Sequence, residues 1–103
     1  MSLPKGTKWL ITRASVPDQK IEITSSSGEM FTAKYLDIGD PSEFVGEVWI
    51  RDENEVINIK QHNHTAHYVA FHTGLRRAKG DAYAGSWYDV AGHSGLQFSL
   101  TKL

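Results

Sequence analysis

Residues 84–102 have the sequence AGSWYDVAGHSGLQFSLTK, which predicts two short strands around a glycine-rich turn. Gly92 and Gly95 supply the positive φ that a tight turn requires. Alternate residues of a strand share a face; these are Tyr83, Gly85, Trp87 and Asp89 in the first strand and Leu96, Phe98 and Leu100 in the second. The hairpin therefore indicates antiparallel pairing at the C-terminal end of the chain.

The rest of the chain shows the same period-two alternation, and no window has the i, i+3, i+4, i+7 spacing of a helix. Turn residues such as Val16-Pro17-Asp18 and Gly39-Asp40-Pro41-Ser42 interrupt the alternation at short intervals. Residues 74–81 form the longest polar connection. The residues predicted to point inward are Ile21, Ile23, Phe44, Val48, Ile57, Ile59, Val69, Phe71, Phe98 and Leu100.

This pattern predicts an all-β fold of about eight short antiparallel strands, near seven residues each, in an up-and-down meander. Because a closed barrel has no edge strands, we expect the meander to close on its own first strand. A β-sandwich is the alternative, but its crossovers between sheets are usually longer than the connections here. We expect residues 1–103 to form a single barrel domain.

Composition excludes several classes of function. The net charge is −1 and there is no cysteine, so we expect no nucleic-acid partner, no membrane partner and no thiolate metal site. No apolar run is long enough to span a bilayer, and the first residues lack the apolar stretch of a secretory signal. These features favour a cytoplasmic location.

The C-terminal half also resembles a known group of proteins. Gly85-Ser86-Trp87-Tyr88-Asp89, Gly92-His93-Ser94-Gly95 and Phe98-Ser99-Leu100 resemble the closing hairpin of small bacterial calycin-like barrels, the group that includes lipocalins and avidins. Val56-Ile57-Asn58-Ile59 and Tyr68-Val69-Ala70-Phe71 are similar to the two preceding strands. The resemblance implies a barrel that holds a small, largely apolar molecule or serves as a scaffold, and it transfers no ligand residue.

Four residues are the candidate ligand-binding side chains. Trp87, Tyr83 and Asp89 share one predicted face, where the aspartate would anchor a ligand at the barrel mouth, and Phe71 is predicted to point into the same interior. Alternatively, Trp87 packs in the core without contacting a ligand, since the indole ring supplies a large buried area.

A histidine-rich segment gives a second candidate site. Four of the five histidines lie between His62 and His72. Neutral imidazoles of His62, His64 and His67 would suffice for an open zinc or copper site. The alternative is an exposed polar turn, because no acidic residue lies within the cluster.

Three functions follow from these patterns. The first is a non-catalytic barrel that binds a small hydrophobic or amphipathic molecule. The second is a structural or homo-oligomerising module that pairs, as a homodimer, through an exposed aromatic face such as Trp49 and Val45. The third is a metal-dependent enzyme that uses the histidine cluster. The sequence indicates no catalytic residue and no cofactor; Gly92-His93-Ser94-Gly95 does not match a nucleophile elbow, because a strand follows it.

Overall fold

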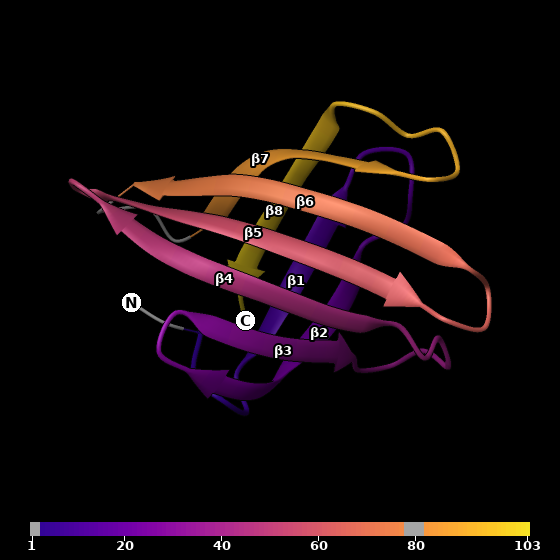
Figure 1. Ribbon diagram of the computed structural model, residues 1–103, viewed down its shortest axis with the longest axis horizontal. Coiled ribbons are helices and arrows are strands. Elements are labelled where there is room, and N and C mark those ends of the chain that lie inside the picture. Colours follow the sequence, from indigo (N-terminus) through magenta and orange to yellow (C-terminus); the bar gives the residue numbers. More distant parts are fainter. Residues whose placement is uncertain (1–2, 78–81) are drawn as a thin grey trace.

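The computed structural model describes residues 3–77 and 82–103 and shows an eight-stranded antiparallel barrel (Figure 1). The strands are β1 (Lys8–Arg13), β2 (Gln19–Ser27), β3 (Met30–Tyr35), β4 (Glu43–Arg51), β5 (Asn54–Asn63), β6 (Tyr68–Arg77), β7 (Ala82–Asp89) and β8 (Leu96–Lys102). Each strand pairs with its neighbours in the sequence, so the chain forms a meander.

The barrel closes because the last strand pairs with the first. Ile11 of β1 lies opposite Leu100 of β8, and Trp9 lies opposite Lys102. The prediction of a closed all-β meander is confirmed, and the chain does not form the alternative sandwich. Within the described ranges, no helix is long and apolar enough to cross a membrane.

Period-two alternation places the core inside the barrel. In β1, Trp9 and Ile11 are buried, whereas Lys8 is exposed and Leu10 is partly exposed. Eight of the ten residues predicted to point inward are buried in this core, namely Ile21, Ile23, Phe44, Val48, Ile57, Ile59, Phe98 and Leu100. Trp9, Tyr83 and Trp87 add the largest buried rings.

The predicted orientation of β6 was wrong. Val69 and Phe71 lie on the outer face, where Phe71 is 45% exposed, and Ala70 and His72 are buried instead. The segment Tyr68-Val69-Ala70-Phe71 is continuously apolar, so its alternation does not identify the inward face. Trp87 and Phe98 already fill the neighbouring interior, where the ring of His72 packs against both of them.

Two further expectations need correction. The strands contain six to ten residues and are thus often longer than the predicted seven. The polar segment predicted as a connection begins as strand, because β6 continues to Arg77, and residues 78–81 lie outside the described part of the chain.

The two ends of the barrel differ. The loops 14–18, 36–42, 64–67 and 90–95 follow the odd-numbered strands and gather at one end, on the right in Figure 1; we call this end the mouth. Towards the opposite end, Leu3 is buried and the hydroxyl of Tyr83 donates a hydrogen bond to Glu55 at 2.7 Å. Three buried polar side chains, Arg13, Gln61 and His72, lie towards the mouth.

Candidate functional site

Near the mouth, the inward-facing positions of the strands are occupied by polar residues in place of apolar ones. Arg13 follows Trp9 and Ile11 in β1, and Tyr35 follows Phe31 and Ala33 in β3. Gln61 and His72 take the equivalent inward positions on β5 and β6. All four of these side chains are buried. The meander brings them together, because the odd-numbered strands end, and the even-numbered strands begin, at the mouth.

The guanidinium of Arg13 is held by neutral groups. Nη1 donates to Oε1 of Gln61 at 2.7 Å, and Nη2 donates to the hydroxyl of Tyr35 at 2.8 Å. The guanidinium carbon lies 5.5 Å from the centre of the Trp87 ring. Among the described residues, no carboxylate forms a salt bridge with Arg13. Within residues 3–77 and 82–103, this buried cation therefore has no anionic partner within salt-bridge distance.

Gln61 connects Arg13 to the rim of the mouth. Because a guanidinium only donates, the amide oxygen of Gln61 must face Arg13, and the amide nitrogen then faces Tyr35 and Ser42, each at 3.1 Å. The hydroxyl of Ser42 donates to Oδ1 of Asp40 at 2.6 Å. This chain of hydrogen bonds fixes the position of Asp40 relative to the buried arginine.

Asp89 occupies the other side of the rim. Its Oδ2 accepts hydrogen bonds from the hydroxyl of Tyr68 at 2.6 Å and from Nδ1 of His93 at 2.8 Å, and its Oδ1 accepts from the backbone amides of Ala91 and His93. Burial opposes ionisation, but these hydrogen bonds outweigh it and lower the pKa of the Asp89 carboxyl to about 2. Burial and the hydrogen bond to Asp89 raise the pKa of Tyr68.

These groups surround a hollow of about 390 Å³ that opens at the mouth. Its lining is formed by Arg13, Val16, Tyr35, Asp40, Gln61, Asn63, Ala66, Tyr68, Asp89, Ala91 and His93. The volume lies within the range of small-molecule pockets in proteins. The hollow combines a buried cation, two carboxylates and small apolar side chains.

The buried ring of His72 lies against Arg13 and is neutral at pH 7. Burial, together with the charge of Arg13, lowers the pKa of His72 to about 4; the hydrogen bond to the carbonyl of Ile59 and the charge of Asp89 oppose this shift only in part. Nδ1 lies 3.4 Å from the carbonyl of Ile59, and Nε2 lies 3.4 Å from Nη1 of Arg13. Since the carbonyl only accepts and the guanidinium only donates, the proton of the neutral ring belongs on Nδ1.

The depressed pKa of His72 predicts a pH-dependent stability. An unfolded chain binds a proton at this histidine near its ordinary pKa of 6.5, whereas the folded protein binds it only near 4. The free energy of unfolding is therefore expected to fall by about 3 kcal/mol as the pH drops from about 6.5 to about 4. Urea denaturation across this range measures the fall, and the variant His72→Gln should lose most of it. An equally steep fall in that variant would contradict the assignment to His72.

The structure does not bring the four predicted ligand-binding residues together. Asp89 lines the hollow, and Trp87 lies fully buried beside it, with its ring stacked 4.7 Å from that of His93. Tyr83 is buried away from the hollow, where it packs against Trp9 and donates to Glu55. Phe71 lies on the outer surface.

The three histidines of the predicted metal site lie outside the interior. The ring centres of His62, in β5, and His64, in the following loop, are 3.8 Å apart. Desolvation lowers the pKa of His62, and the charge of His64 lowers it further. His67 lies at the end of the same loop. No group of three or more His, Asp or Glu side chains in the described ranges is arranged to hold a metal ion. The metal site stays a prediction.

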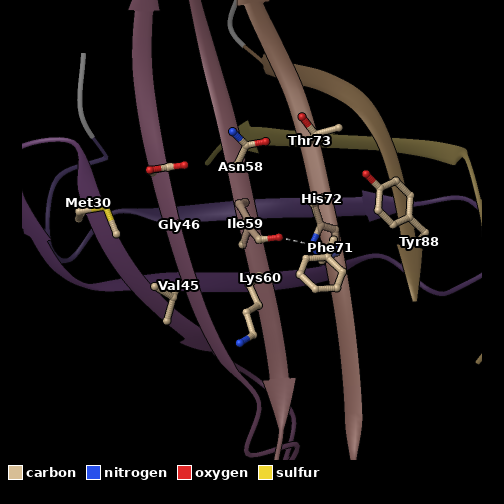
Figure 2. A pocket seen from close by; sticks show the side chains of 11 residues that line it. Met30, Val45, Gly46, Asn58, Ile59, Lys60, Phe71, His72, Thr73 and Tyr88 are labelled. Atoms are coloured by element: carbon tan, nitrogen blue, oxygen red, sulfur yellow. Dashed lines mark hydrogen bonds between the residues drawn. The ribbon is translucent and has the colours of Figure 1, made fainter. Parts of the chain in front are cut away.

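A second hollow lies on the outside of the barrel wall. It has a volume of about 570 Å³ and runs over β3 to β7 (Figure 2). Met30, Val45, Phe71 and Tyr88, each between 42% and 49% exposed, border it, and Lys60 lies among them. We call this surface the outer groove. His72 and Ile59 contribute to it from the wall and carry the hydrogen bond drawn in Figure 2.

Comparison with protein-family models, with curated proteins and with solved structures finds no match for this chain.

Proposed function

We propose that this chain is a non-catalytic binding module, a calycin-like barrel whose mouth takes up a small amphipathic molecule. The observation that carries the proposal is the hollow of about 390 Å³ directly above a buried, hydrogen-bonded arginine. The resemblance of the closing hairpin to calycin-like barrels supports the same function.

The lining of the hollow favours an amphipathic molecule over a purely apolar one. Arg13, Tyr35 and Gln61 bring buried polar side chains to the lining, whereas Val16, Ala66 and Ala91 are its apolar residues. A hydrocarbon placed there would strip water from the polar groups without replacing their hydrogen bonds, which is costly. A molecule with one polar end and a short apolar body meets both parts of the lining.

Native mass spectrometry tests this function on protein that has never been denatured. We expect a fraction of the wild-type protein to carry a bound small molecule that is released on unfolding. Ala66→Trp should remove this species by filling the hollow, and Ala84→Trp, which adds the same ring on the outer surface, should retain it. A mass spectrum without any bound species, or one equally populated in Ala66→Trp, would contradict the proposal.

The outer groove supports a second candidate function, the pairing of two copies of the chain. Exposed apolar patches of this kind often mark interaction surfaces. Glu47 and Lys60 line the same groove, so a two-fold related copy can bring opposite charges together. In this case the barrel would act as a structural module.

Sedimentation equilibrium over a wide range of protein concentrations tests the pairing. The wild-type protein should form dimers, and Phe71→Glu should weaken the association because it places a charge in the groove. Val90→Glu, at an exposed residue outside the groove, is the matched control. A wild-type protein that remains monomeric at millimolar concentration would exclude this function.

A further inference from the structure

Hydrogen-bond donors at the base of the hollow outnumber their acceptors. Nε of Arg13 is buried and has no hydrogen-bond partner. The hydroxyl of Tyr35 accepts from both Arg13 and Gln61, and among the described residues nothing accepts its own proton. A buried donor without an acceptor is costly, and a buried cation beside neutral partners is more costly still. The base of the hollow therefore favours an anionic acceptor.

A free acceptor lies on the rim of the same hollow. All the hydrogen bonds of Asp40, from the backbone and hydroxyl of Ser42 and from the amide of Asn63, go to Oδ1. Oδ2 of Asp40 has no partner among the described residues. Asp89 differs, because each of its two oxygens already accepts two hydrogen bonds. A cationic donor in the hollow would therefore engage Asp40.

We propose that the mouth binds a small zwitterion of the amino-acid class, with its carboxylate on Arg13 and Tyr35 and its ammonium group on Asp40. This inference rests on the proposed function and names its ligand class. The apolar side chain of the ligand contacts Val16, Ala66 and Ala91, which fits an aliphatic amino acid. Opposite charges at the base and on the rim fix the orientation of the ligand, since each end meets its own partner.

Isothermal titration calorimetry with four probes of similar shape tests the assignment. The probes are L-leucine, which carries both charges, 4-methylpentanoate, which carries the carboxylate, 3-methylbutylamine, which carries the ammonium group, and 4-methylpentan-1-ol, which carries neither. We expect each probe that carries the carboxylate to bind about tenfold or more tightly than the matched probe without it, because the hydrogen bonds to Arg13 are charge-assisted and buried. Each probe that carries the ammonium group should bind only about threefold more tightly than the matched probe without it, because Asp40 lies at the solvent-accessible rim.

Variants separate the two contacts. Arg13→Met should abolish the gain from the carboxylate, and Tyr35→Phe, which removes a single oxygen atom, should reduce it. Asp40→Asn keeps the Oδ1 acceptor and should abolish only the gain from the ammonium group. Lys8→Met, on the same strand as Arg13, and Asp37→Asn, in the same loop as Asp40, are exposed controls that should behave like the wild-type protein.

The outcomes distinguish this inference from the function on which it rests. If the alcohol binds as tightly as leucine, or if Arg13→Met and Tyr35→Phe both keep the full gain from the carboxylate, the zwitterion is wrong although the mouth still binds a small molecule. If no probe binds while the native mass spectrum retains a bound species, only the inference fails; if the native mass spectrum is empty as well, the proposed function also fails.

Discussion

Replacing Gly85 with alanine is expected to lower the free energy of unfolding by about 3 kcal/mol or more. Gly85 of β7 lies opposite Gly74 of β6. A Cβ atom at residue 85 would lie 2.0 Å from the carbonyl oxygen of Thr73 and 2.7 Å from the Cα atom of Gly74. Both neighbours are backbone atoms, so the two strands must separate to admit the methyl group. Urea denaturation at neutral pH measures the loss.

Gly39→Ala is the matched control for this experiment. A Cβ atom at residue 39 meets no atom within 4 Å, and its φ is not in the left-handed region. We expect its stability to stay within about 0.5 kcal/mol of the wild-type value. A Gly85→Ala protein as stable as this control would contradict the close approach of β6 and β7.

The second large effect is expected at Gln61. Gln61→Leu keeps the approximate size of the side chain but removes the 2.7 Å acceptor of the buried Arg13 guanidinium. It also removes the amide that donates to Tyr35 and Ser42. Leaving a buried cation without its main acceptor should cost about 2–4 kcal/mol in the free energy of unfolding.

Arg13→Met, in contrast to Gln61→Leu, should cost little stability. It removes the buried cation itself, and a flexible apolar chain of similar length replaces it against Trp87. We expect its stability to lie within about 1 kcal/mol of the wild-type value, because losing the desolvation cost of the cation offsets the loss of the donor to Gln61 and Tyr35. The double variant Arg13→Met, Gln61→Leu should then be more stable than Gln61→Leu alone. Denaturation curves of the three variants measure this coupling, and a larger loss in Arg13→Met than in Gln61→Leu would contradict it.

Most of the fold was predictable because alternation and turn residues are local signals. Ile21 and Ile23, or Phe98 and Leu100, define the inward face of a strand on their own. Short connections then leave few topologies other than a meander. The failure at Val69 and Phe71 has a physical cause: when both faces of a strand carry apolar residues, only the space left by its neighbours decides which face is buried.

The site was harder to predict, although one signal was present. Arg13, Tyr35 and Gln61 each continue an inward row of apolar residues by one step, at the same end of β1, β3 and β5. In a meander those three strand ends meet at one mouth. Because the three residues lie at the alternate positions that face inward, the sequence indicated that they would be buried close together. Asp40, Ser42 and His93 lie in loops without periodicity, and no local pattern places them.

The central claim is that the mouth binds the ligand. An NMR titration with L-leucine that follows the backbone amide signals of the whole chain tests this claim most directly. We predict that the shifted signals belong to the mouth, from Arg13, Asp40, Ala66 and their neighbours, and that signals over the outer groove, such as those of Lys60 and Phe71, stay in place. Shifts confined to the outer groove, or no shift at millimolar leucine, would contradict this account.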